Sequence, residues 1–357
     1  MLNFTVGPVQ VEDRIREIGH DQVPYFRTPE FSAVMLENER LILKFMRAPK
    51  NSRAVFLTGS GTFAMEASVE NLVTRNDKVL IVNGGTFGQR FTDICRYRNL
   101  NFEEIKLPYG TPLCRKDLAP YENKGFTVLL INVHETSTGV LYDMDMVGQF
   151  CAENGINLIA DAISAFLADD VDMEKWGALA VITSSQKALA CHPGISIVAL
   201  SGKAVETARK NQADALYYDF IPMLDNGVRG QTPFTPAVNI LLQINARLVD
   251  VEKRGGAESE VSRTKGLAEY FRKGIKDFPF EEFSLSPSNA VTALRPKNVP
   301  AYGIFTELKD RYGIWVCPNG GELKDVLLRV GHIGALKFAD YDRLFEALTD
   351  LKNKGKL

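Results

Sequence analysis

The first clear structural unit of the chain is AVFLTGSGTFAMEASVENLV, residues 54–73. Its first four residues are apolar, as in a buried strand, and the Gly-Ser-Gly-Thr sequence that soon follows is typical of a tight turn. Residues 62–73 then have the mixed composition of a helix that is covered on one side. The stretch therefore predicts a strand, a turn and a helix in direct succession.

The same order of elements is repeated as far as Ser201. Several of the short runs are apolar on both faces, as in strands that helices cover on both sides. The repetition predicts an α/β fold with a mainly parallel sheet and right-handed crossovers. Only a short link separates the last two runs, which allows one strand near residue 200 to be antiparallel. The expected strands are 54–57, 78–83, 102–107, 127–133, 156–161, 179–184 and 195–201, and the expected helices are 62–73, 87–98 and 143–155.

The rest of the chain predicts a smaller α+β unit. A long helix is expected at 236–256, where a pair of glycines ends it. A further helix, the short strands AVTALRP, IWVCPN and DVLLRVG, and a final helix follow. We predict a large domain at 16–255, a small C-terminal domain at 256–357, and an N-terminal arm at 1–15 that is associated with the small domain.

The composition is that of an ordinary globular enzyme. The 357 residues carry a net charge of -2 and contain no basic tract, so we expect neither a nucleic-acid nor a membrane partner. No apolar run reaches the ~20 residues that a membrane helix needs, and the N-terminus does not resemble a signal peptide. The five cysteines and four histidines show no metal-ligand spacing. We therefore expect a reduced cytoplasmic enzyme without a metal.

The turn before the helix 62–73 is a candidate anion site. Backbone N–H groups at a helix start point towards a ligand, small residues let the ligand approach, and Ser60 and Thr62 add hydroxyl groups. A tight turn with Thr62 as the helix cap is the alternative. The turn is not a Walker P-loop, because no Gly-Lys-Ser/Thr sequence follows it.

Charged residues follow or interrupt three apolar strands. Asp161 ends the strand INLIAD, where it could pair with a protonated ring nitrogen or cap the next turn. Lys187 follows LAVITS, where it could be a nucleophile with a lowered pKa or an exposed loop residue. Arg329 lies within DVLLRVG, where it could bind a carboxylate or form a structural salt bridge. With the anion site, these residues form the set that pyridoxal phosphate and an amino-acid substrate need.

The same residues resemble those of the class V aminotransferases, which are fold-type I pyridoxal-phosphate enzymes. The likeness runs from Gly7-Pro8 to about Gly334 and is greatest to the alanine–glyoxylate/serine–pyruvate and 2-aminoethylphosphonate–pyruvate aminotransferases. It rests on the motifs GSGTFAMEA, NGGTFGQR, HETSTGV, SSQKAL and LRVGHIG. The resemblance implies a mainly parallel seven-stranded sheet with helices on both faces, pyridoxal 5′-phosphate as cofactor, and a homodimer with shared active sites.

The resemblance also implies roles for residues at the cofactor. Lys187 matches the lysine that forms the internal aldimine, and Gln186 matches a hydrogen-bond donor to the cofactor phosphate. Asp161 matches the partner of the pyridine nitrogen. Phe87 matches a ring stacked on the cofactor, with a helix core residue as the alternative, and Thr136 matches a hydroxyl near the phenolic oxygen. The phosphate-binding turn is matched by Ser60, Gly61 and Thr62.

Other matches concern the substrate and the partner subunit. Arg329 matches the arginine that binds the substrate carboxylate, and Gly7 belongs to the loop that closes over the substrate. Thr235 and, less well, Thr232 match the segment that reaches the partner's cofactor phosphate. Arg27 could face a second anion of the substrate, or it could pair on the surface with Glu30 or Glu37.

These matches predict a transaminase that moves an amino group from a small donor to a small 2-oxo acid such as pyruvate or glyoxylate. Donors of the alanine or serine type and 2-aminoethylphosphonate remain open. Position 62 is a threonine, as in the aminoethylphosphonate group, whereas the alanine–glyoxylate group often has histidine there. A cysteine desulfurase or related lyase that uses Cys317 or Cys191, and a non-catalytic relative, are the alternatives.

Overall fold

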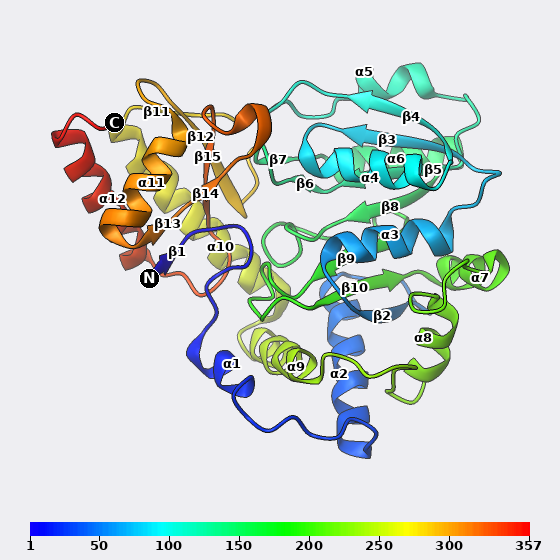
Figure 1. Ribbon diagram of the computed structural model, residues 1–357. Helices are drawn as coiled ribbons and strands as arrows, with labels where there is room; N and C mark the ends of the chain where they lie inside the picture. The colour runs from blue at the N-terminus through cyan, green and yellow to red at the C-terminus, as the bar shows by residue number, and fades with distance from the viewer.

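A seven-stranded sheet forms the centre of the computed structural model, which describes residues 1–357 (Figure 1). The strand order is β2-β10-β9-β8-β5-β3-β4. β10 runs antiparallel to both of its neighbours, and the other pairs are parallel. The expected mainly parallel sheet, with one antiparallel strand near residue 200, is therefore confirmed. The bounds are β2 (Arg53–Thr58), β3 (Lys78–Asn83), β4 (Asn101–Lys106), β5 (Val128–Asn132), β8 (Asn157–Asp161), β9 (Ala178–Ser184) and β10 (Ile195–Leu200).

Helices cover both faces of this sheet because its strands are apolar on both sides. Successive residues of β3 alternate between two separate cores, with Val79 and Ile81 in one and Leu80 and Val82 in the other. One core includes residues of α3 (Gly61–Leu72), α4 (Thr86–Tyr97), α7 (Gly202–Asn211) and α8 (Phe220–Gly227). The other includes residues of α1 (Asp13–Ile18), α2 (Pro29–Phe45), α6 (Met144–Asn154) and α9 (Val238–Lys253).

A second, smaller unit has its own sheet and its own core (Figure 1). Its four strands are antiparallel, in the order β11-β12-β15-β14. Leu2 and Phe4 join this core because β1 pairs in parallel with β13. This packing supports the proposed arm and the proposed division near residue 255. The bounds are α10 (Gly256–Gly274), β11 (Phe280–Glu282), β12 (Val291–Pro296), α11 (Ala301–Tyr312), β13 (Ile314–Trp315), β14 (Cys317–Pro318), β15 (Leu328–Gly331), α12 (Phe338–Asn353) and β1 (Leu2–Asn3).

Several elements differ from the sequence-based expectation. The run IWVCPN is not one strand, since β13 pairs with the arm whereas β14 pairs with β15. The helix expected at 236–256 ends at Lys253, and the next helix begins at Gly256 after the positive φ of Gly255. Elements that were not expected are the helices α1, α2, α7, α8 and α11, the strands β1 and β11, and the shorter α5 (Arg115–Leu118), β6 (His134–Glu135), β7 (Val140–Leu141) and three 3-10 turns at Ala119–Tyr121, Ile275–Asp277 and Gly321–Leu323. None of the helices combines the length and the apolar character that crossing a membrane would require.

Candidate active site

A cavity of about 410 Å³ lies at the carboxyl ends of β8 and β9, which is where open α/β sheets bind their ligands. The structure brings together here nine of the residues that the sequence predicts for the site: Gly7, Ser60, Gly61, Thr62, Phe87, Thr136, Asp161, Gln186 and Lys187. Five further residues complete the lining: Pro8, Arg90, Ile163, Ser164 and Pro193. The N-terminal arm contributes the first two residues of the chain that reach this cavity.

The start of α3 forms one wall of the cavity. Ser60 is the N-cap residue, and its hydroxyl makes no capping hydrogen bond, so the alternative with Thr62 as the cap is wrong. The first N–H groups of the helix have no intrahelical acceptor, and a Cβ atom at Gly61 would collide with Ile163. Arg90 donates from Nη1 to the Thr62 hydroxyl over 2.8 Å. The helix start, the free hydroxyl and this guanidinium together favour an anion.

Asp161 ends β8 and is buried beneath the cavity. Its Oδ2 accepts a hydrogen bond from the Asn132 amide, and its Oδ1 accepts one from the N–H of Ile163, both over 2.8 Å. The second bond shows that Asp161 does cap the following turn. Burial raises the pKa of Asp161 to about 6 although both bonds oppose the rise. A cation in the cavity would therefore stabilise its charged form.

Lys187 lies in the turn that follows β9. This turn is fixed by backbone hydrogen bonds, including one from the N–H of Ala190 to the carbonyl of Lys187 over 2.8 Å. Burial lowers the pKa of Lys187 to about 8, and the nearby guanidinium groups of Arg329 and Arg90 act in the same direction. Its ammonium forms no ion pair with a carboxylate, and it lies 5.8 Å from the centre of the Phe87 ring. Lys187 is therefore an amine that is partly neutral near pH 7 and can act as a nucleophile, rather than an exposed loop residue.

Gly7 brings the arm against this lysine. Its φ of +142° is rare for residues that carry a side chain, and a Cβ atom there would lie 2.9 Å from the Lys187 Nζ. The arm is held close by a hydrogen bond of 3.2 Å from the N–H of Val9 to the carbonyl of Gln186. Only glycine leaves Lys187 room at this position.

A chain of polar groups that was not predicted from the sequence lies beside the cavity. The Thr136 hydroxyl lies 2.7 Å from that of Ser164, which lies 2.9 Å from the His134 Nδ1. Burial, followed by the charge of Lys187, lowers the pKa of His134 to about 3, so the imidazole is neutral. Glu135 accepts hydrogen bonds from the N–H groups of Phe87 and Gly88 and thereby fixes the start of α4. Their place in the sequence could have indicated them, since His134 and Glu135 lie in HETSTGV beside Thr136, and Ser164 lies in ADAISAF just after Asp161.

Arg329 lies behind the cavity on β15 and is buried. Its Nη1 donates to the carbonyl of Thr136 over 3.0 Å, and its Nη2 donates to that of Pro318 over 2.8 Å. Its Nε has no partner. No carboxylate lies within ion-pair distance, so a structural salt bridge is excluded as its role here. The guanidinium keeps its charge unpaired beside a cavity-lining residue.

Arg27, Thr232 and Thr235 do not reach this cavity within one chain. Arg27 donates to the carbonyls of Thr232 and Pro233 over 3.3 and 3.2 Å. It pairs with neither Glu30 nor Glu37, and the surface ion pair expected for it is therefore wrong. The Thr232 hydroxyl donates to the carbonyl of Phe234, and Thr235 is exposed. No three His, Cys, Asp or Glu side chains are grouped so that they could hold a metal ion.

Comparisons with known proteins show the family and the fold of the chain. The sequence profile of the family described as "Aminotransferase class-V" matches residues 20–324. A Synechococcus protein named "Soluble hydrogenase, small subunit" is 30% identical over 92% of this chain and 86% of its own. The L-aspartate–glyoxylate aminotransferase of Paracoccus denitrificans is 27% identical over 93% and 86%. The crystal structure of a Thermus thermophilus aspartate aminotransferase superposes with a TM-score of 0.90 at 28% identity, covering 98% of this chain and 99% of that one.

The fold is therefore that of the fold-type I pyridoxal-phosphate enzymes, and the chain belongs to the class V aminotransferases. It is a transaminase whose cofactor is pyridoxal 5′-phosphate. The cavity fits this cofactor on its own chemistry, since it offers an amine without a counter-ion, a buried carboxylate without a cation and an anion-binding helix start.

The lowered pKa of Lys187 predicts how fast the apo-protein captures its cofactor. Only the neutral amine attacks an aldehyde, and the fraction of neutral amine rises with pH through the pKa of about 8. The rate of covalent capture, followed by stopped-flow absorbance, should therefore rise with pH and level off above about 9. A midpoint near the ~10.4 of an exposed lysine would contradict this environment for Lys187.

Proposed function

We propose that this transaminase moves an amino group from a small donor to a small 2-oxo acid such as pyruvate or glyoxylate. Donors of the alanine or serine type and 2-aminoethylphosphonate are the candidates from the sequence, and the name of the Paracoccus relative adds aspartate. The observation that carries the proposal is the meeting of Lys187 and Asp161 in one small cavity. Neither group is neutralised by the residues around it.

The cofactor would be held by residues that end or follow the strands β2, β3, β6, β8 and β9. Ser60, Gly61, Thr62 and Gln186 would bind its phosphate, with the charge of Arg90 close by. Asp161 would pair with its ring nitrogen, Phe87 would stack on the ring, and Thr136 would face the phenolic oxygen. When bound, pyridoxal phosphate supplies an electron sink that weakens the Cα–H bond of the substrate amine.

Lys187 would carry a proton between the Cα atom of the substrate and the C4′ atom of the cofactor. A pKa of about 8 lets its amine both accept and return a proton near neutral pH. Arg329 would bind the substrate carboxylate, because its charge is unpaired and its planar fork fits two oxygens. Gly7 would place the arm over the substrate, and the neutral His134 would hold the Ser164 and Thr136 hydroxyls without adding a competing charge.

An assay with single donors tests the function. We expect the holoenzyme to convert pyruvate or glyoxylate with at least one of alanine, serine, aspartate and 2-aminoethylphosphonate, as measured by the keto product. Lys187→Ala should lose nearly all turnover, whereas Lys175→Ala, which removes an exposed lysine paired with Asp145, should retain it. Full activity of Lys187→Ala would overturn the assignment.

Incubation of the holoenzyme with cysteine alone tests the desulfurase alternative. That chemistry needs a reactive thiol, and burial raises the pKa of Cys191 to about 12, which makes Cys191 unsuitable. Cys317, on β14, is partly exposed. Release of sulfide from cysteine without any added 2-oxo acid would favour the alternative.

A pair of buried aspartates tests the role of Asp161. Asp161→Asn should lower kcat by about a hundredfold or more, because a neutral amide cannot hold a positive ring nitrogen. Asp169 is an internal control: it is also buried, and burial also raises its pKa to about 6. It binds Ser288 and the N–H of Asn289 away from the cavity. Asp169→Asn should therefore lower thermal stability and change kcat by only a few-fold.

We also propose a homodimer in which each site borrows residues from the partner. The placement of Thr232 and Thr235 outside their own cavity supports this proposal. The cytoplasmic location stays a prediction from the sequence.

Mixed dimers test the sharing of residues. A Lys187→Ala chain lacks the amine, and a Thr235→Asp chain should repel the partner's cofactor phosphate, so each homodimer should be nearly inactive. In a mixed dimer, one site would combine an intact Lys187 with an intact Thr235. Each mixed dimer should have about half of the activity of a wild-type dimer. With random pairing half of the dimers are mixed, so the co-expressed preparation should recover up to about a quarter of the wild-type activity, whereas no gain over the parents would contradict the exchange.

A further inference from the structure

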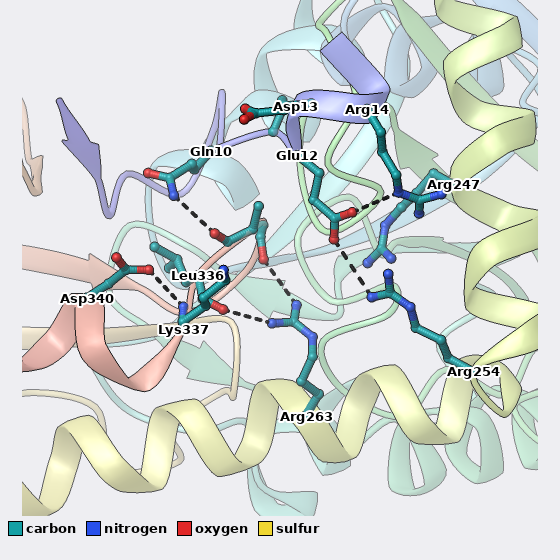
Figure 2. Close-up of a pocket in the computed structure, with 13 residues that line it drawn as sticks. Gln10, Glu12, Asp13, Arg14, Arg247, Arg254, Arg263, Leu336, Lys337 and Asp340 are labelled. Atoms are coloured by element: carbon teal, nitrogen blue, oxygen red, sulfur yellow. Dashed lines mark hydrogen bonds and ion pairs between the residues drawn. The ribbon is translucent and has the colours of Figure 1, made fainter. Parts of the chain in front are cut away.

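A second and larger cavity, of about 710 Å³, lies where the arm, α9, α10 and the segment 334–340 meet. Figure 2 shows Glu12, Arg14, Arg247 and Arg254 pointing towards one another, with Arg263 reaching up from α10 to the segment around Leu336. Only three of the thirteen lining residues are hydrophobic. None of these residues takes part in the catalytic cavity.

Ion pairs connect the parts of the chain around this cavity. Glu260 of α10 accepts from Arg247 over 2.5 Å and from Arg263 over 2.7 Å. Asp250 of α9 lies 2.6 Å from the Arg14 guanidinium and 2.7 Å from that of Arg254. These contacts place two carboxylates behind the arginines.

A third carboxylate faces the same group. Glu12 of the arm lies 3.0 Å from Arg14 and 3.7 Å from Arg254. The remaining charges on the lining are satisfied locally: Asp13 pairs with Arg16, and the Asp340 carboxylate accepts from the N–H of Lys337 at the start of α12.

The cluster has one positive charge in excess. Four guanidinium groups (Arg14, Arg247, Arg254 and Arg263) face three carboxylates (Glu12, Asp250 and Glu260), and the remaining Lys337 and Asp340 balance each other. Arg247 is only 3% exposed, and its Nε and Nη1 have no hydrogen-bond partner, although Nη1 is 3.7 Å from Asp250. Buried guanidinium donors without acceptors are costly, which indicates a missing anionic partner.

We propose that this cavity binds a small oxyanion, either inorganic phosphate or the carboxylate of a small acid. Arg247 would offer its two free donors, and Arg254 and Arg263 line the same space. A guanidinium fork matches two oxygens of either anion. The site is separate from the catalytic one and does not rest on the proposed function.

The position of the anion gives it a physical effect. The arm pairs with the small unit here, through a bond from the N–H of Ala335 to the carbonyl of Gln10 and one from the Gln10 amide to that of Ala335. Three residues earlier in the chain, Gly7 lies so close to Lys187 that an added Cβ atom would be 2.9 Å from the Lys187 Nζ. An ion that binds only this assembled arrangement raises the melting temperature.

The test is a charge series on the holoenzyme. The cluster has no excess positive charge in Arg254→Gln, one in the wild type and two in Glu12→Gln. The side chains of Arg254 and Glu12 are 48% and 32% exposed, so both variants should fold. Affinity for inorganic phosphate, measured by calorimetry at constant ionic strength, should rise by about five- to tenfold per step. The melting-temperature gain on adding phosphate should follow the same order, and Arg254→Lys should restore it.

Controls locate the ion and identify its source. Arg40→Gln, which removes an exposed arginine paired with Glu37, should bind phosphate as wild type does, and a parallel titration with succinate tells whether a carboxylate is preferred. Equal affinities across the charge series would overturn the proposal. Loss of binding in Arg329→Gln with retention in Arg254→Gln would also overturn it, since the ion would then lie in the catalytic site.

Discussion

The structure depends on keeping a lysine amine and a carboxylate buried at one sheet edge without letting them neutralise each other. Lys187 has no carboxylate partner, and Asp161 is held by two neutral donors, the Asn132 amide and the N–H of Ile163. Burial moves the pKa of each group towards neutrality. An amine and an acid that both titrate near pH 7 are what proton transfer at a bound cofactor needs.

The surroundings preserve this state by geometry. The parallel strands β5 and β8 deliver Asn132 and Asp161 to adjacent positions, because the two residues pair in register. Glu135 fixes the start of α4, so that the Phe87 ring faces the cavity, and the neutral His134 anchors the Ser164 and Thr136 hydroxyls. The arm then closes over Lys187 with a glycine, the one residue type without a side chain to displace the amine.

A second group of charged residues, the cluster of Arg14, Arg247, Arg254 and Arg263, lies at the junction of the two units. There, ion pairs add to the apolar packing between the arm and α9. The balance of charge leaves one guanidinium short of acceptors. The arm therefore connects two electrostatic sites, since Gly7 touches Lys187 and Gln10 pairs beside the cluster.

Much of the fold could be predicted from the sequence, because strands buried on both faces leave a clear apolar pattern. All seven strands of the central sheet lie within about a residue of their expected positions. α2 was not predicted, although Thr28 caps it and Pro29 is its first residue, a combination that is typical of a helix start. IWVCPN was misread as one strand because a sequence run does not show that its two halves pair with different partners.

The sequence by itself determined the α/β architecture and the candidate residues at the strand ends, because periodicity and residue type are local properties. It left each of those residues with an alternative role. Only the tertiary structure decided that Lys187 has no counter-ion, that Arg329 has no carboxylate partner and that Arg27 lies outside its own cavity. Pairing and burial depend on segments that are far apart in the chain, such as Thr136 and Arg329, and no local pattern records them.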